Sequence, residues 1–397
     1  MTTAASSATS VKGYQPTALE AACGILWELD TDAEPLPDES PVHTAREAFE
    51  QGVLGGLMRP PCAVSFSGGR DSSAVLAVAT HVARREGLPL PIPVTLRFPL
   101  CATSDESVWQ ESVIDHLGLD DWCRVELTDE IDVLGPYAQQ VLLRHGSIWP
   151  FNAHFHAPIA EQVAGGSVLT GVFGDELLSA WPSRRVAMII SRQTRPRLRD
   201  IPSVARALAP RAVRGLLNER DYSKREPLPW LLPDARREVS RARGRATALE
   251  PSRWDESVRR YWWRSRYLRA GGDSLRRVIS DAGASAVHPL SNRDFLIAIA
   301  AERAQLGFRN RTQAMEILFG DLLPPPILSR TTKSVFNTAF WEHRAREFVA
   351  QWDGSGLDES VVDIDVLRAV WSDDQPDSHS FILLQQAWLQ QYGRSGS

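Results

Sequence analysis

Residues 64–73 constrain this chain more than any other segment, because they join a strand to a helix through a turn with two glycines. They read VSFSGGRDSS, where an apolar run precedes Gly68 and Gly69 and the helical pattern AVLAVATHVARR follows. A helix N-terminus presents unpaired N–H groups and favours negative charge. Glycine also permits a close backbone approach that a Cβ would block. The segment therefore predicts a phosphate-binding turn.

This turn differs from the common nucleotide-binding loops. It matches neither G-x-G-x-x-G nor G-x-x-x-x-G-K-[ST], and Asp71 stands where the second of these patterns has lysine. A carboxylate beside phosphate groups requires a divalent cation between them. We therefore expect the turn to bind phosphates together with a metal ion.

Strand-like and helix-like segments alternate after residue 61. The segments that read as strands are 62–67, 91–98, 121–128 and 167–178, the last ending in a turn, and those that read as helices are 72–86, 104–117 and 132–144. This alternation is typical of a parallel, doubly wound α/β sheet. Beyond residue 185 the strand signal fades, and an Arg-, Ala- and Leu-rich helical pattern continues to residue 392.

Charge is distributed unevenly along the 397 residues, whose formal net charge is −5. Residues 184–277 hold 25 Lys and Arg against 10 Asp and Glu, so the rest of the chain is strongly acidic. The contrast indicates an anionic partner, a salt-bridged interface with the acidic part, or a solvated arginine-rich surface.

Nothing in the sequence indicates a membrane or secreted protein, and we expect a cytoplasmic one. No run of 18 apolar residues is present. The N-terminus lacks the basic segment and apolar core of a secretory signal. The four cysteines are widely spaced and form no C-x-x-C pair, which is typical of free thiols in a reducing compartment.

Five motifs follow the order found in one known family. SGGRDSS resembles the pyrophosphate loop of ATP pyrophosphatases. The others are TSDES (103–107), LTGVFGDELL (169–178), HPLSNRDFLIAIA (288–300) and LLPPPILSRTTKSVF (322–336). Over residues 46–392 the chain therefore resembles the asparagine synthetase-like family, which includes β-lactam synthetases and lasso-peptide macrolactam synthetases.

The resemblance implies an ATP pyrophosphatase-type fold and an AMP-forming carbon–nitrogen ligase. Such enzymes use ATP and Mg²⁺ to activate a carboxylate as an acyl-adenylate, release pyrophosphate, and let an amine attack. We accordingly expect a flexible extension and linker over residues 1–42, an ATP-binding α/β domain over 43–185, and a helical, Arg-rich substrate-binding region over 186–397.

The resemblance also assigns candidate site residues. Asp71 and Asp175 are the expected magnesium ligands, and the backbone around Leu96 is expected to hold adenine. Glu176 is either a ligand or a helix cap. The residues expected to bind the nucleotide are Ser65, Ser67, Gly68, Gly69, Asp71, Ser72, Ser73, Leu96, Gly171 and Glu176.

Lys333 is the predicted catalytic cation, beside Asp71 and Asp175. A positive point charge stabilises the oxyanion that forms when the amine attacks. Arginines number 41, whereas Lys12, Lys224 and Lys333 are the only lysines. Because an Arg fork does not simply replace an ammonium group, a lysine at the family's motif position indicates function.

The chain departs from its relatives at three points. It reaches the phosphate loop by residue 67, so we expect no glutaminase domain. Val172 stands where asparagine synthetases have Glu and β-lactam synthetases have Tyr, so any general base must come from elsewhere in the protein or from the substrate. Asn292 stands where the family motif P-x-x-D has Asp, which puts the usual role of that motif in doubt.

Within the family, the runs SVWQESVIDHLGLDDW and PFNAHFHAPI most resemble the lasso-peptide macrolactam branch, which implies macrolactam or isopeptide formation on a ribosomal peptide. His154 and His156 are two residues apart, as on one face of a strand. They are expected to form part of the wall of the acceptor pocket, with a metal site as the alternative. A peptide or small-molecule carboxylate is the expected substrate, with a partner protein that presents a precursor peptide as a further possibility.

Three other functions stay open at this level. The chain could be a small-molecule amide synthetase or an asparagine synthetase-type enzyme that uses an external amine. It could modify nucleic acid, for which the basic segment argues, although nucleic acid is not the expected partner. It could also be a non-catalytic scaffold, for which Val172 and Asn292 argue.

Overall fold

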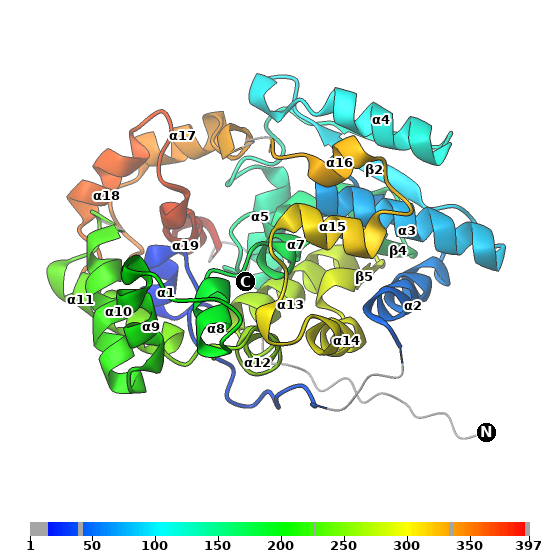
Figure 1. Ribbon diagram of the computed structural model, residues 1–397. Helices are drawn as coiled ribbons and strands as arrows, with labels where there is room; N and C mark the ends of the chain where they lie inside the picture. The colour runs from blue at the N-terminus through cyan, green and yellow to red at the C-terminus, as the bar shows by residue number, and fades with distance from the viewer. Residues whose placement is uncertain (1–14, 39–42, 226–227, 333–336, 394–397) are drawn as a thin grey trace.

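The computed structural model describes residues 15–38, 43–225, 228–332 and 337–393. Its centre is a parallel sheet in the order β3-β2-β1-β4-β5. The strands are β1 (Cys62–Ser65), β2 (Ile92–Arg97), β3 (Cys123–Glu126), β4 (Ser167–Leu169) and β5 (Ser285–Val287). Helices surround the sheet (Figure 1), so the prediction of a parallel, doubly wound α/β fold is confirmed.

Helices make up most of the remaining described chain. They are α1 (Ala18–Cys23), α2 (Ala45–Leu57), α3 (Arg70–Glu86), α4 (Ser107–Leu117), α5 (Pro136–His145), α6 (Ala157–Glu161), α7 (Gly174–Leu178), α8 (Arg184–Ile190), α9 (Ile201–Leu208), α10 (Arg211–Arg225), α11 (Pro233–Thr247), α12 (Trp254–Glu256), α13 (Arg266–Asp281), α14 (Arg293–Arg303), α15 (Arg311–Phe319), α16 (Pro325–Ser329), α17 (His343–Gln351), α18 (Ile364–Trp371) and α19 (Phe381–Tyr392). None of these described helices has both the length and the apolar character needed to cross a bilayer.

Side chains of the central strands alternate between two hydrophobic cores, as successive residues of a strand point to opposite faces. Val64 and Leu169 lie in a core that includes residues of α2, α3, α14 and α15. Ala63 and Val168 lie in a second core with residues of α6 and α13. Both faces of the sheet are therefore buried, which explains why its strands are nearly continuous apolar runs.

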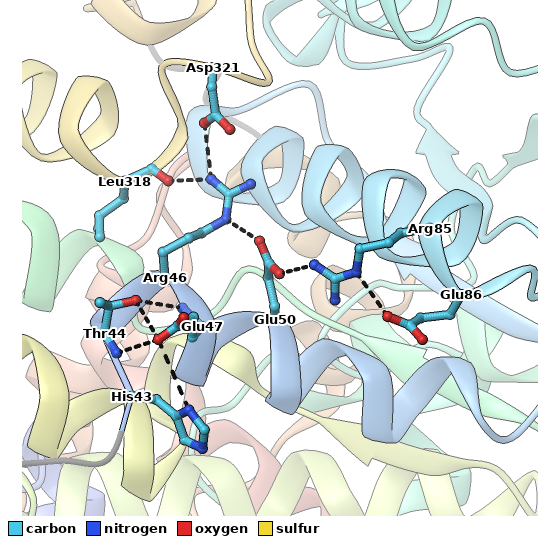
Figure 2. Close-up of polar contacts among 9 residues, drawn as sticks. All are labelled: His43, Thr44, Arg46, Glu47, Glu50, Arg85, Glu86, Leu318 and Asp321. Atoms are coloured by element: carbon cyan, nitrogen blue, oxygen red, sulfur yellow. Dashed lines mark hydrogen bonds and ion pairs between the residues drawn. The ribbon is translucent and has the colours of Figure 1, made fainter.

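Charged side chains connect the helices of the first core (Figure 2). Glu50 of α2 accepts hydrogen bonds from Arg46 at 2.7 Å and from Arg85 of α3 at 2.5 Å. Arg46 also donates to the carbonyl of Leu318 at 2.6 Å and to Asp321 at 3.1 Å. These contacts join α2, α3 and the end of α15 into one packed unit beside the sheet.

The strand β5 was not foreseen. Helical structure was expected beyond residue 185, but Ser285–Val287 pairs in parallel with β4. A strand of three residues is too short to produce a readable alternation of apolar and polar positions. The C-terminal part is therefore mainly helical, as expected, yet it also supplies an edge of the sheet.

Part of the predicted flexible extension is packed against the rest of the protein. Residues 1–14 and 39–42 lie outside the described part, but α1 within residues 15–38 is largely buried. Ala22 and Cys23 are fully buried, and the Ala22 carbonyl accepts a hydrogen bond from the Trp230 indole at 2.7 Å. The expectation of flexibility is therefore wrong for α1, because its short apolar run completes a core formed by distant residues.

Ion pairs connect this N-terminal segment to the basic segment 184–277. Glu20 is paired with Arg266 at 2.8 Å, and Asp30 with Arg269 at 2.5 Å. The side chains of Glu20 and Arg266 are 1 % and 9 % exposed, so water screens this pair poorly. Of the three interpretations of the charge contrast, the salt-bridged interface is borne out for this part of the chain.

Candidate active site

The main cavity lies where the order of the strands reverses. The chain passes from β1 to β2 on one side, whereas β4 pairs with the other side of β1, with Val64 opposite Leu169. In open α/β sheets this reversal creates a crevice beyond the carboxyl ends of the strands. The cavity has a volume of about 430 Å³. Its described lining consists of Ser65, Ser67, Gly69, Arg70, Asp71, Ser72, Glu106, Pro150, Asn152, Ala153, Phe155, His156, Thr170, Gly171, Val172, Asp175, Leu275, Arg311, Arg330, Thr331 and Thr332.

The phosphate turn follows β1 and leads into α3. Gly68 has φ +81°, a left-handed conformation that favours glycine. The Ser72 hydroxyl accepts a hydrogen bond from the Ser67 backbone N–H at 3.2 Å and donates to the Gly69 carbonyl at 3.1 Å, which closes the turn. No side chain caps the start of α3. Its first N–H groups are thus left for an anion.

A second turn follows β4 and fits tightly against the first. A Cβ on Gly171 would lie 2.7 Å from the Ser72 backbone nitrogen, and one on Gly174 would lie 2.3 Å from the Asp71 carboxyl carbon. Gly171 therefore faces backbone that cannot give way, whereas a Cβ at Gly174 would displace the Asp71 carboxylate. The strand predicted over 167–178 is short: β4 ends at Leu169 and α7 begins at Gly174.

Asp71 and Asp175 come from these two turns and meet at the guanidinium of Arg311. One nitrogen of Arg311 contacts Asp71 and another contacts Asp175. Burial raises the pKa of Asp71 above its ordinary value, and the Arg311 charge opposes that shift. Arg311 starts α15 and lies 240 residues after Asp71.

The two carboxylates suit a magnesium ion. The Asp71 Oδ1 atom is buried and has no hydrogen-bond partner among the described residues. Magnesium commonly takes one or two protein carboxylates and completes its shell with phosphates and water. Within the described part of the chain, no group of three or more His, Cys, Asp or Glu side chains forms a fuller metal site. Asp71 and Asp175 are thus the residues that would hold it.

A buried ion pair connects the phosphate turn to the segment before Lys333. Arg330, which is 6 % exposed, forms an ion pair with Glu106 and donates to the Gly68 carbonyl at 2.8 Å. The Arg330 guanidinium also lies 4.7 Å from the ring centroid of Trp109. Because Glu106 is equally buried, the pair fixes the start of this segment against the turn.

A smaller cavity adjoins the main one on the side of β2. Leu96, expected near adenine, lies in its wall. The two cavities share Ser65, Ser67, Glu106 and Phe155. The Thr95 hydroxyl donates to the Phe66 carbonyl at 2.8 Å, which ties β2 to the start of the phosphate turn.

The opposite wall of the main cavity is mostly apolar and contains His156. The predicted strand around His154 and His156 is wrong, because Ala153–His156 form a 3₁₀ turn. In that turn the two rings diverge: His154 contacts the Ile131 carbonyl at 2.9 Å, whereas His156 lines the cavity. Burial lowers the pKa of each ring to about 4.

The predicted nucleotide-binding residues fall into distinct groups. Those that line the main cavity are Ser65, Ser67, Gly69, Asp71, Ser72 and Gly171, and Asp175, the other expected magnesium ligand, lines it too. Gly68 faces Arg330 instead, Ser73 is fully buried within α3, and Glu176 accepts a hydrogen bond from the Tyr267 hydroxyl. Lys333 lies outside the described residues, although Thr331 and Thr332 before it line the cavity.

Two charged residues of the site were not predicted from the sequence. Glu106 was part of a quoted motif without a role, and Arg311 was not singled out. Arg311 is one arginine among 41, so composition carries no signal for it. The one local sign is its place at the start of α15, directly after Asn310, whose side chain accepts from the Gln313 N–H at 2.8 Å.

The doubt about Asn292 has a structural answer. Asn292 is the N-cap of α14, and its side-chain oxygen accepts hydrogen bonds from the backbone of Asp294 at 2.9 Å and of Phe295 at 3.3 Å. Asn and Asp are about equally good at this position. The substitution therefore preserves the helix start and does not indicate loss of function.

Comparison with protein families identifies a match over most of the chain. The family described as asparagine synthase matches residues 45–390, which is most of the chain. No curated protein matches the chain.

Proposed function

The chain belongs to the asparagine synthase family, and from this premise we propose that it activates a carboxylate as an acyl-adenylate and joins it to an amine. Membership makes it an ATP-dependent carbon–nitrogen ligase. The observation that carries the finer proposal is the meeting of Asp71 and Asp175 at the cavity, beside an uncapped helix N-terminus. That arrangement suits a pyrophosphate leaving group, and hence release of AMP.

The turn residues have separate roles in this proposal. Ser67, Gly69 and the N-terminus of α3 hold the phosphates of ATP. Asp71 and Asp175 hold Mg²⁺, which when bound neutralises charge on the leaving pyrophosphate. Lys333 stabilises the oxyanion formed when the amine attacks.

The apolar wall of the cavity indicates which class of carboxylate the protein binds. Its described residues Pro150, Ala153, Phe155, Val172 and Leu275 carry no charge that would recognise the α-ammonium and α-carboxylate groups of a free amino acid. This favours a carboxylate within a peptide, and thus macrolactam or isopeptide formation, with or without a partner protein that presents the peptide. A small-molecule carboxylate with an external amine is the alternative.

The test is to measure AMP and pyrophosphate release in the presence of Mg²⁺ and ATP. The carboxylates offered are free aspartate, free glutamate, and synthetic peptides that carry one Asp or Glu side chain and a free N-terminal amine. We expect release of both products with at least one peptide, together with a cyclic amide product that has lost one water molecule.

The variant Asp71→Asn should lower that release by roughly 10²- to 10³-fold or more, because it removes charge where the leaving group is held. Asp115→Asn, an exposed position on α4, is the matched control and should retain wild-type release. Formation of ADP and phosphate in place of AMP and pyrophosphate would refute the proposal. Release with free amino acids alone would favour the small-molecule alternative.

A further inference from the structure

The proposed reaction requires a group that accepts a proton from the amine. When the amine adds to the acyl carbon, its nitrogen becomes positively charged and must lose a proton before the amide is stable. Val172 cannot take that proton. The carboxylates of the described cavity wall are already paired, since Asp71 and Asp175 contact Arg311 and Glu106 contacts Arg330.

Among the described residues that line the cavity, His156 has a ring nitrogen that can accept a proton and is not paired with an arginine. It is 9 % exposed and borders the main cavity. The Ala153 backbone favours a proton on the ring, and Nδ1 is buried with no hydrogen-bond partner among the described residues. In the neutral ring one nitrogen carries a proton and the other can accept one.

The His156 ring lies on the wall of the cavity that also contains Val172. Ala153, in the same 3₁₀ turn, packs in one cluster with Val172 and Leu275. Hydrogen bonds from the Ala153 N–H to the Pro150 carbonyl at 3.0 Å and from the Phe155 N–H to the Asn152 carbonyl at 3.0 Å hold the turn in place. His156 thus occupies the same wall as the position where relatives carry Glu or Tyr.

The surroundings keep the ring uncharged until ligands bind. Burial lowers the pKa of His156 to about 4, and the neighbouring His154 ring acts in the same direction. Burial lowers the pKa of His288 to about 3, and its Nδ1 contacts the Thr170 hydroxyl at 2.7 Å. Anionic phosphates bound in the cavity would favour an imidazolium, so proton acceptance becomes easier once the nucleotide is present.

We propose that His156 accepts the proton that the amine loses during attack on the acyl-adenylate, an inference that rests on the function proposed above. The amine nitrogen forms a bond to the acyl carbon, and the bond from that carbon to the AMP oxygen breaks with its electron pair. The proton passes from the nitrogen to His156. Atoms and charges balance with AMP as the leaving group.

The two halves of the reaction separate this role from a structural one. His156→Gln keeps a polar side chain of similar size but removes the imidazole. With the peptide that gives the most pyrophosphate in the panel above, we expect pyrophosphate–ATP exchange within about threefold of wild type. Amide formation should fall about 10²-fold or more, as typical for loss of a general base.

Two further measurements make the test specific. Hydroxylamine is uncharged at neutral pH and strongly nucleophilic, so hydroxamate formation from the acyl-adenylate should survive in His156→Gln. Adding Val172→Glu to His156→Gln should restore part of the amide formation, since it returns a carboxylate to the same wall. His81→Gln, an exposed position on α3, is the control and should match wild type.

Each other outcome has a definite meaning. Unchanged amide formation in His156→Gln would overturn the inference, and so would an equal loss of exchange and amide formation, because that result indicates a general disturbance of the site. Absence of exchange in the wild-type protein with every carboxylate would overturn the proposed function itself.

Discussion

Arg311 pairs with both carboxylates that we propose as magnesium ligands. Its guanidinium contacts both Asp71 and Asp175, and its side chain is 16 % exposed. Removal of one partner from a buried ion pair leaves an uncompensated charge and typically costs about 3–5 kcal/mol. Magnesium at the same carboxylates would supply positive charge in its place.

Arg311→Ala should therefore make the stability of the protein dependent on magnesium. We expect a lower melting temperature for this variant without Mg²⁺, and a larger rise in melting temperature on addition of MgCl₂ than in wild type. Arg309→Ala, exposed two residues earlier, is the control. Equal stabilisation of wild type and Arg311→Ala by MgCl₂ would contradict the assignment of Asp71 and Asp175 as ligands.

The buried His154 and His156 and the partly buried His288 make the fold sensitive to mild acid. Burial lowers the pKa of the first two to about 4 and of the third to about 3. In the unfolded chain each ring titrates near pH 6.5. Between these values the unfolded state binds more protons, so the free energy of unfolding falls as pH falls below about 6.5.

Between pH 7 and pH 5 each ring should lower the free energy of unfolding by about 2 kcal/mol. Urea unfolding at pH 7 and pH 5 measures the sum. His154→Gln should reduce the difference between the two pH values, whereas His43→Gln, at an exposed position, should leave it unchanged. A free energy of unfolding that stays constant between pH 7 and pH 5 would refute this account.

At the scale of elements, the two turns after β1 and β4 act as one unit. Gly174 permits α7 to begin against the Asp71 carboxylate, and Gly171 permits the chain to pass the start of α3. The turns are complementary in shape because the hydrogen-bonded pairing of β1 and β4 brings their ends together. A substitution in one turn should therefore change the geometry of the other.

Gly174→Ala should displace Asp71 and weaken binding of Mg·ATP more than it weakens the fold. Overpacking of this kind typically costs about 1–3 kcal/mol. Calorimetric titration with Mg·ATP and thermal unfolding measure the two effects. Gly55→Ala is the matched control, because a Cβ there meets no atom within 4 Å and alanine favours the helix α2. Wild-type affinity in Gly174→Ala would show that the turns are independent.

At the scale of the whole molecule, three regions distant in sequence depend on one another. The segment after residue 15 covers a core formed by C-terminal helices and Trp230. Arg266 at the start of α13 contacts Glu20 in this segment, and α13 in turn packs against the sheet. The molecule therefore does not divide energetically at the N-terminal linker.

Arg266→Ala should lower the free energy of unfolding by about 3–5 kcal/mol, because it leaves the Glu20 carboxylate buried without its cation. Arg260→Ala is the control, since Arg260 is 51 % exposed and pairs with the exposed Asp38; its cost should stay within about 1 kcal/mol. Denaturant unfolding of both variants measures the difference. Similar costs for the two variants would contradict the role of the N-terminal segment as part of the core.

The glycine turn at 64–73, the parallel sheet and the family could be predicted from the sequence alone. Each of these depends on signals within a few tens of residues: the strand, glycines and helix start at 64–73, the alternation of apolar runs, and the order of motifs. Asp71 stood out within the glycine turn, whereas Asp175 was singled out through the resemblance of LTGVFGDELL to the family motif. Local hydrogen bonding and side-chain periodicity are sufficient to specify such features.

Only the tertiary structure decided which residues share the site. Strand pairing places the ends of β1 and β4 side by side, and helix packing brings Arg311 to Asp71 across 240 residues. The 3₁₀ turn at Ala153–His156 directs one histidine into the core and the other into the cavity. These arrangements arise from long-range packing and buried charge, for which spacing along the chain carries no signal.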